Sequence, residues 1–235
     1  MIQGHAMKTI GLIGGMSWES TATYYQLLNR LVRERLGGLH SAKLLLWSFD
    51  FAEIEAYQAD GDWDAATRAM VAAAQALERG GAEMILICTN TMHKMADEVQ
   101  AAISVPLLHI ADVTAEALLK AGRRKPLLLA TAYTMEQEFY TSRLKARGLE
   151  VMISSAPDRA CVHGVIYDEL CKGIIEPASR AQWNAIVDRA AAAGADSVIF
   201  GCTEVGLLLR PEELPLPCFD TTEIHAVAAL DRALA

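Results

Sequence analysis

Two turns in this sequence carry side chains that could act on a small molecule. The first, Thr89-Asn90-Thr91, offers two hydroxyls, an amide and the N–H groups of a following helix, a set of donors that suits a carboxylate. In the second, Cys202 is followed by Thr203, and a thiol at a helix N-terminus has its pKa lowered by the helix dipole. Taken alone, the first turn is explained better by ordinary helix capping. Face to face, the two turns would flank one ligand.

Two further turns combine glycine or hydroxyl groups with an expected helix start. Gly14 and Gly15 follow the first expected strand, and Ser20 is placed to cap the next helix. The turn lacks the third glycine of a dinucleotide-binding motif and the lysine of a P-loop, which disfavours a nucleotide. It fits a small-anion site and a plain tight turn equally well. Thr134 closes a hydroxyl-rich turn of the kind that precedes helices.

The cysteines and histidines form no recognisable metal motif. The five cysteines are widely spread without a CxxC pair, and free thiols fit a reducing compartment. None of the six histidines has a partner at the i, i+4 spacing of a helical metal site. We therefore expect no bound metal and a cytoplasmic location.

The elements that must position these turns are those of a mostly parallel α/β fold. Apolar runs of strand length alternate with longer, Ala-rich amphipathic stretches. Most strands are apolar throughout, so we expect helices on both faces of the sheets. The expected strands are 9–14, 42–49, 83–88, 106–110, 126–130, 150–154, 197–201 and 218–219. The expected helices are 20–36, 62–79, 92–103, 114–121, 136–147, 161–172, 179–193 and 223–234.

The segments 80–91 and 193–204 read as copies of one another, each with a helix end, an apolar strand and a Cys/Thr-rich turn. If each copy closes an equivalent position in its own domain, both turns lie at the carboxyl ends of strands, where open α/β sheets bind ligands. The expected domains are 7–117 together with 214–235, and 118–213. Residues 1–6 precede a second methionine and are expected to be a tag remnant or disordered.

The charge balance disfavours two classes of partner. The chain has 235 residues and a formal net charge of −8, from 21 Lys and Arg against 29 Asp and Glu. This balance offers little attraction for nucleic-acid phosphates or anionic lipid. No apolar stretch reaches about eighteen residues, the length of a transmembrane helix. We expect neither nucleic acid nor a membrane as a partner.

Three motifs, in this order along the chain, resemble the cofactor-independent aspartate/glutamate racemase family. They are Gly-Gly-Met-Ser-Trp-Glu-Ser (14–20), Cys-Thr-Asn-Thr-Met-His (88–93) and Gly-Cys-Thr-Glu (201–204). The resemblance covers essentially the whole chain and is strongest to the bacterial L-aspartate/glutamate-specific, or broad-specificity, branch. It implies two similar Rossmann-like domains with mostly parallel four-stranded sheets and an amino-acid substrate in the cleft between them. It also implies a homodimer and no pyridoxal phosphate or other cofactor.

The family uses two cysteines on opposite faces of the substrate Cα, one to remove a proton and one to return it. The resemblance places Cys202 as the second cysteine, but Thr89 stands where the first is expected. Cys88 is one residue out of register, and neighbouring strand residues point to opposite faces, so Cys88 cannot simply replace it. A threonine hydroxyl ionises too weakly to act as a base near neutral pH. Cys202 is therefore expected to remove the proton of an L-amino acid, with Thr89 on the opposite face.

The resemblance also implies which groups hold the substrate. Asn90, Thr91, Thr134 and Thr203 match positions that cradle the α-carboxylate, and Met16 lies in the turn over the substrate. Donors that are already in place stabilise the charge that builds on the carboxylate as the proton leaves.

The distal end of the substrate is where this chain departs from the family. The resemblance places Glu55 and Cys171 near the family's Arg and Lys positions, with Lys172 adjacent and Gln58 nearby. Loss of a bidentate Arg removes the strongest recogniser of a carboxylate. Gln58 can hydrogen-bond a carboxylate, an amide or a hydroxyl, so we expect a specificity that extends beyond aspartate and glutamate.

Two other functions stay open. A decarboxylase or isomerase of the same superfamily also works with a single cysteine, although the hydroxyl-rich turn at 89–91 favours an amino-acid carboxylate. A non-catalytic amino-acid-binding protein would keep the binding turns after it had lost a catalytic cysteine. Chiral analysis with L-Glu, L-Asp and a neutral L-amino acid distinguishes a racemase from both.

Overall fold

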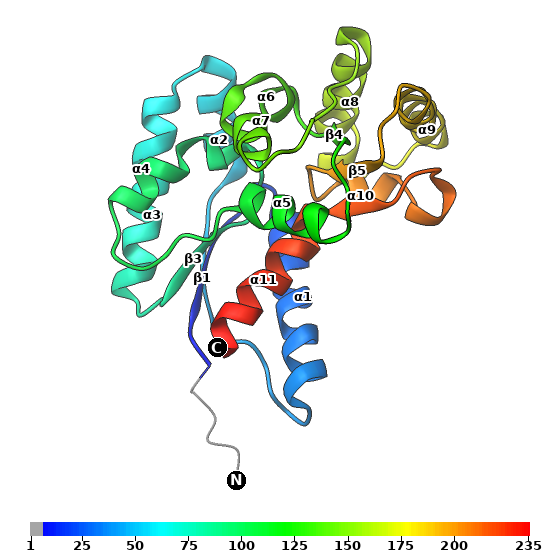
Figure 1. Cartoon of the computed structure of the whole chain (residues 1–235). Coiled ribbons are helices and arrows are strands. Elements are labelled where there is room, and N and C mark those ends of the chain that lie inside the picture. The colour runs from blue at the N-terminus through cyan, green and yellow to red at the C-terminus, as the bar shows by residue number, and fades with distance from the viewer. Residues whose placement is uncertain (1–6) are drawn as a thin grey trace. The chain divides into compact units, whose positions relative to one another are not determined.

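A computed structural model describes residues 7–235, so the expectation for residues 1–6 lies outside the described residues (Figure 1). The chain divides into two compact units. One joins the segment that ends at His109 to His225–Ala235, and the other is Ile110–Ile224. No helix among the described residues is long and apolar enough to cross a membrane.

The sheet of the first unit is parallel throughout, with the strand order β2-β1-β3. Its strands are β1 (Ile10–Gly14), β2 (Leu44–Ser48) and β3 (Met84–Ile87). Its helices are α1 (Trp18–Leu36), α2 (Phe51–Asp60), α3 (Trp63–Arg79), the 3₁₀ helix η1 (Thr91–Met95) and α4 (Ala96–Ala101). In the position of a fourth strand, Leu107 makes a single parallel bridge to Ile85. The expected strand 106–110 is cut short because the next helix begins at Ile110.

The second unit has a parallel sheet with the order β4-β5-β6. Its strands are β4 (Pro126–Leu129), β5 (Ser197–Phe200) and β6 (Cys218–Asp220). Its helices are α5 (Ile110–Lys120), α6 (Ala132–Glu136), α7 (Glu138–Ala146), α8 (Ala156–Asp168), η2 (Leu170–Lys172), α9 (Pro177–Ala192), α10 (Val205–Leu208) and η3 (Pro211–Glu213). Met152 bridges to Leu127 beside β4. The expected strand 150–154 is thus also reduced to a bridge, because the chain turns at Ser155 to begin α8.

The two sheets share one topology. When the strands and the bridged segments are numbered along the chain within each unit, both sheets read 2-1-3-4. The third strand is β3 in one unit and β5 in the other, and these are the strands that precede the two chemistry-bearing turns. This supports the internal repeat. The expectation of four strands per sheet is not confirmed, because each unit has three strands and one bridged residue beside them.

The boundaries between the units differ from the expected ones. The first falls before α5 rather than at 117, because α5 runs through 117 without a break. At the other end, β6 pairs with β5, so the chain returns to the first unit only at His225, within α11 (Thr221–Leu234), rather than at 214. Figure 1 shows this last part of α11 beside α1 and the start of β1, where the Lys8 N–H donates to Ala233 O at 3.0 Å.

The turn between β1 and α1 is built for close packing. Gly15 has φ +84°, and a Cβ there would lie 2.3 Å from the carbonyl oxygen of Phe49. The Gly15 N–H donates to the Thr21 hydroxyl at 2.8 Å, which favours a tight turn over an anion site. The helix cap is Ser17 rather than Ser20: the Ser17 hydroxyl accepts from the Ser20 N–H at 3.3 Å.

The hydrophobic pattern does not indicate α2, in which only Ile54 and Gln58 are buried. The residues that indicate this helix in the sequence are those at its two ends. The Asp50 carboxylate accepts from the Ala52 N–H at 3.1 Å, and Gly61 ends the helix in the left-handed conformation. This helix matters because it carries Gln58 to the candidate site.

Candidate active site

The Thr89-Asn90-Thr91 turn follows β3 at its carboxyl end. Thr89 is partly buried, whereas Asn90 and Thr91 are buried. Asn90 stands at the N-cap of η1 but makes no side-chain capping hydrogen bond, so ordinary capping does not explain its presence. The hydroxyl of Ser20 donates to the carbonyl oxygen of Cys88 at 2.9 Å and ties the start of α1 to this turn.

Cys88 is not available as the missing thiol. Its side chain is 1% exposed, and burial raises the pKa of its thiol far above the ordinary range. A buried neutral thiol cannot serve as a base near neutral pH. Cys88 therefore occupies a core position, whereas Thr89, the next residue, is partly accessible.

Gln58 lies beside the Thr-Asn-Thr turn. Its amide donates to the sulfur of Met92 at 3.1 Å, and Met92 directly follows Thr91. Met16 is buried in the hydrophobic cluster that also contains Met92. The structure thus brings Gln58 and Met16 into the neighbourhood of the turn, while their contact with a substrate stays a prediction.

Cys202 follows β5, and its thiol donates to a carboxylate oxygen of Glu204 at 2.8 Å. Burial raises the pKa of the Cys202 thiol well above its ordinary value, and the negative charge of Glu204 raises it further. The expectation that a helix dipole lowers this pKa is wrong. The helix after the turn, α10, has only four residues, too few for its dipole to outweigh burial beside a carboxylate.

Glu204 is a candidate residue to which the sequence analysis gave no role, although it is part of the Gly-Cys-Thr-Glu motif. Its side chain is 4% exposed, so the protein holds this carboxylate away from bulk water beside the thiol. A buried carboxylate bonded to a thiol can accept its proton as the thiolate forms. The signal in the sequence was an acid two residues after the cysteine. Thr203, between them, is partly buried.

Thr134 lies in the turn after β4 and is fully buried. Its N–H donates to the hydroxyl of Thr131 at 3.4 Å, and the two hydroxyl oxygens are 3.2 Å apart. This confirms the expected hydroxyl-rich turn before a helix. Its role in holding a substrate carboxylate stays a prediction.

The sequence pattern of the Asp/Glu/hydantoin racemase family matches residues 13–229, the range that holds both turns. The chain belongs to this family. Its resemblance to the aspartate/glutamate racemases, inferred from three short motifs, is confirmed.

Individual relatives agree with this assignment. The chain is 27% identical to the broad-specificity amino-acid racemase RacX of Bacillus subtilis (strain 168) over 178 residues, which is 74% of this chain and 75% of RacX. It is similar to the crystal structure of a candidate Asp/Glu racemase from Yersinia pestis, with 51% identity, a TM-score of 0.92 and coverage of 97% and 100% of the two chains. An aspartate racemase homologue from Pyrococcus horikoshii OT3 gives 35% identity, a TM-score of 0.84 and coverage of 97% and 99%.

The residues expected near the distal end of the substrate lie as follows. Cys171 in η2 is close enough to Cys202 to contribute to the raised pKa of its thiol. Lys172 points to the surface, where its ammonium lies 3.5 Å from the Asp168 carboxylate and its side chain is 60% exposed. Glu55 on α2 is exposed. The structure therefore places Cys171, but not Lys172, beside the Cys202 turn.

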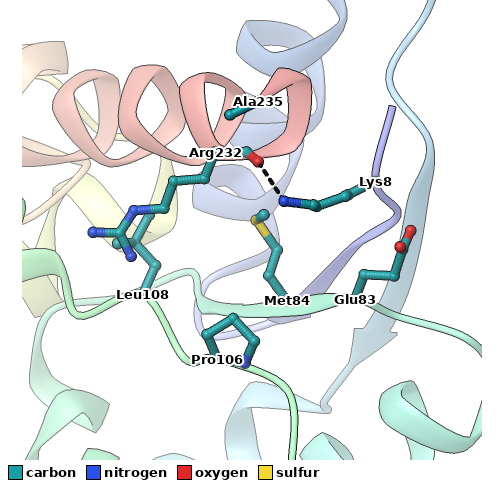
Figure 2. Close-up of a pocket in the computed structure, with 7 residues that line it drawn as sticks. All are labelled: Lys8, Glu83, Met84, Pro106, Leu108, Arg232 and Ala235. Carbon is teal, nitrogen blue, oxygen red and sulfur yellow. Dashed lines mark hydrogen bonds between the residues drawn. The ribbon is translucent and has the colours of Figure 1, made fainter. Parts of the chain in front are cut away.

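A pocket of about 450 Å³ lies elsewhere in the first unit (Figure 2). Its lining includes Lys8, just before β1, and Glu83, just before β3. The pocket therefore lies at the amino ends of these strands, whereas the Thr-Asn-Thr turn lies at the carboxyl end of β3. Two of its charged side chains form hydrogen bonds with backbone groups. The Lys8 ammonium donates to the Arg232 carbonyl at 3.3 Å, and the Glu83 carboxylate accepts from the Thr9 N–H at 2.7 Å. Because open α/β sheets bind ligands at strand carboxyl ends, this pocket is not the candidate active site.

Proposed function

We propose that this protein is an amino-acid racemase that acts without pyridoxal phosphate on L-aspartate, L-glutamate or a broader set of L-amino acids. In this proposal Cys202 removes the Cα proton and Thr89 lies on the opposite face of Cα. Membership of the racemase family and the likeness to RacX support the reaction class. The observation that carries the assignment of the base is the 2.8 Å hydrogen bond from the Cys202 thiol to Glu204.

The raised pKa of Cys202 means that the free protein holds a thiol rather than a thiolate. We propose that Glu204 takes the thiol proton, which leaves a thiolate beside a neutral carboxylic acid and keeps the total charge of the pair constant. The thiolate then takes the Cα proton and becomes a thiol again. The positive ammonium group of the substrate would favour the thiolate in a site with little water.

The Thr89 turn and the Cys202 turn are the proposed sources of the substrate-binding groups. Each turn follows the third strand of a 2-1-3-4 sheet, where ligands of such sheets bind. Asn90, Thr91, Thr134 and Thr203 are proposed to hold the α-carboxylate. Their role is to stabilise the negative charge that grows on it as the Cα–H bond breaks.

Gln58 is the proposed contact for the substrate side chain. It is buried beside the turn, where its amide donates to the sulfur of Met92. A glutamine amide can hydrogen-bond a substrate carboxylate, amide or hydroxyl. A neutral amide discriminates among these groups less than an arginine fork, which supports broad specificity.

We also propose a homodimer, formed through the face that α1 and β2 share. Trp18 and Tyr25 are 68% and 57% exposed, and they line a groove with Leu46 of the edge strand β2. α1 carries Glu19 in its first turn and Arg33 in its last, so two copies packed antiparallel about a two-fold axis would pair opposite charges. Light scattering should show a dimer for the native protein and a monomer for Tyr25→Glu. A native monomer at micromolar concentration would contradict this.

The reaction is tested by incubating L-Glu, L-Asp and L-homoserine with the protein in D₂O, followed by chiral chromatography and mass spectrometry. We expect the D-enantiomer to appear, and deuterium to enter recovered L-substrate at least as fast as the D-enantiomer forms. Deuterium in the D-product but never in recovered L-substrate would contradict Cys202 as the base on that side. Binding without exchange or turnover would instead identify a non-catalytic amino-acid-binding protein.

Two variants test the roles of the pair. Cys202→Ser should abolish exchange into the L-substrate. Glu204→Gln keeps a hydrogen-bond acceptor for the thiol but cannot take its proton, so kcat should fall by about 10²-fold, the lower range for loss of general-base catalysis. Glu212→Gln, which changes an exposed carboxylate of η3, is the matched control and should behave like the native protein. Native activity in Glu204→Gln would remove Glu204 from the mechanism.

A further inference from the structure

Three histidines that are far apart in the sequence are buried together behind the Thr-Asn-Thr turn. His93, His109 and His225, here called the histidine cluster, are 2%, 6% and 0% exposed. The ring centroids of His93 and His109 are 4.6 Å apart, and those of His93 and His225 are 5.8 Å apart. All three belong to the first unit. Nothing in the proposed reaction uses them directly, so their burial needs an explanation.

Hydrogen bonds indicate which ring nitrogens carry protons. His225 Nε2 lies 2.9 Å from the carbonyl oxygen of Leu108, and His93 Nδ1 lies 2.8 Å from the carbonyl oxygen of Thr89. A carbonyl oxygen only accepts, so each of these two bonds requires a proton on its ring nitrogen. The Leu108 carbonyl is a second acceptor beside His93, and the tautomer measurement below decides which of the two carbonyl groups receives the His93 proton. The other nitrogen of His225, Nδ1, is then free to accept from the Tyr24 hydroxyl at 2.8 Å. Burial lowers the pKa of both imidazoles, so they are neutral at pH 7.

The His93 bond acts on the residue that the proposed function places opposite Cys202. The Thr89 carbonyl and the Asn90 N–H share one peptide plane, so a bond to the carbonyl fixes the orientation of both. His93 also donates its own backbone N–H to the carbonyl oxygen of Asn90 at 3.1 Å. The turn is therefore held from His93 at two successive carbonyl groups.

The other members of the cluster hold the His93 ring in place. His225 contacts it edge-on at 64°, and His109 lies against it at a 55° tilt. His225 is in turn fixed by Tyr24 on α1 and by Leu108. A ring packed on two sides and bonded on one edge has little freedom, and this rigidity is transmitted to the Thr89 carbonyl.

We infer that His93 is a positioning residue, which holds the Thr89 turn through the Nδ1–H bond so that the Thr89 hydroxyl meets the face of Cα opposite Cys202. This rests on the proposed racemase function. His93 itself is buried and does not touch the substrate. Its loss should therefore impair the step on the Thr89 face while leaving proton removal by Cys202 intact.

The tautomer is tested first, without any activity measurement. A long-range ¹H–¹⁵N spectrum of the ¹⁵N-labelled protein at pH 7 should show His93 protonated at Nδ1, with the His93→Asn spectrum used for assignment. A His93 ring protonated only at Nε2 would overturn the inference, whatever the protein catalyses.

The kinetic test compares two rates that share Cys202 but differ in their need for Thr89. In D₂O, deuterium entry into the recovered L-substrate reports the Cys202 face, and appearance of the D-enantiomer reports both faces. For His93→Leu, we expect the ratio of racemisation to exchange to fall by about tenfold or more. Displacement of a reacting group by a fraction of an ångström can cause a loss of rate of this size. His93→Asn, whose side-chain amide can occupy the position of Nδ1–H, should restore most of that ratio.

Each outcome decides the matter. An equal fall of exchange and racemisation in His93→Leu, or an unchanged ratio, would overturn the positioning role. If His93→Leu does not fold, a native-like ratio in a folded His93→Asn supports the role, and a ratio as low as that of Thr89→Ala refutes it. Absence of exchange in the native protein would refute the proposed function. The tautomer measurement needs no activity, so it tests the His93 hydrogen bond separately from the proposed function.

Discussion

Acidification should destabilise the first unit through the histidine cluster, and His225 gives the magnitude. Burial, with a smaller contribution from the charge of Arg232, lowers the pKa of His225 from 6.5 to about 4. A group whose pKa is lower in the folded state favours folding when it is neutral. Its contribution is complete above the unfolded pKa and is lost as the pH falls from 6.5 towards 4. At 1.36 kcal/mol per pKa unit, this amounts to about 3 kcal/mol.

His93 acts in the same pH range, and two carboxylates act at its lower end and below it. Burial and the neighbouring His109 and His225 lower the pKa of His93, so its protonation adds to the loss. Glu78 and Asp196 have lowered pKa values because they accept hydrogen bonds, and they also lose stabilising free energy on acidification. A variant that lacks only the His225 titration separates the cluster from these carboxylates.

The assay is urea unfolding followed by tryptophan fluorescence between pH 7 and pH 4, for the native protein, His225→Gln and His40→Gln. Glutamine keeps a donor for the Leu108 carbonyl but does not titrate. Between these pH values, the free energy of unfolding of the native protein should fall by about 3 kcal/mol more than that of His225→Gln. His40 is exposed, so His40→Gln should follow the native protein. Parallel pH dependences for the native protein and His225→Gln would refute the reasoning.

Two further outcomes are expected. Gly15→Ala should lower the free energy of unfolding by about 2 kcal/mol more than Gly37→Ala, the usual size of an overpacking penalty. Both glycines have positive φ, but only the Cβ at Gly15 would clash, at 2.3 Å from Phe49 O; equal losses in urea unfolding would contradict this. Iodoacetamide should modify Cys88 only after unfolding, whereas the partly exposed Cys161 should react in the native protein, as peptide mass spectrometry can show. Native labelling of Cys88 would refute its burial.

The sequence predicts the strands well because buried parallel strands are short apolar runs that contrast with their surroundings. All six strands found in residues 7–235 overlap expected ones. The two similar segments, 80–91 and 193–204, contain the third strand of two sheets that have the same strand order. The elements that it misses lack such contrast. α2 buries little apolar surface, α10 has only four residues, and η3 has three.

The sequence also places the two candidate turns, because turns at the carboxyl ends of strands can be located once the strands are known. The register argument that separates Thr89 from Cys88 follows from the alternation of side chains along a strand, and the burial of Cys88 agrees with it. Local rules thus suffice for the position of a residue along its own element.

Properties that depend on burial and on neighbours in space were decided by the tertiary structure. The direction of the Cys202 pKa shift reverses because folding buries the thiol and turns the Glu204 carboxylate towards it. The histidine cluster joins residues at 93, 109 and 225, which no spacing rule connects. Solvation and electrostatic interactions fall off over a few ångströms of space and take no account of separation along the chain, so only the folded structure fixes them.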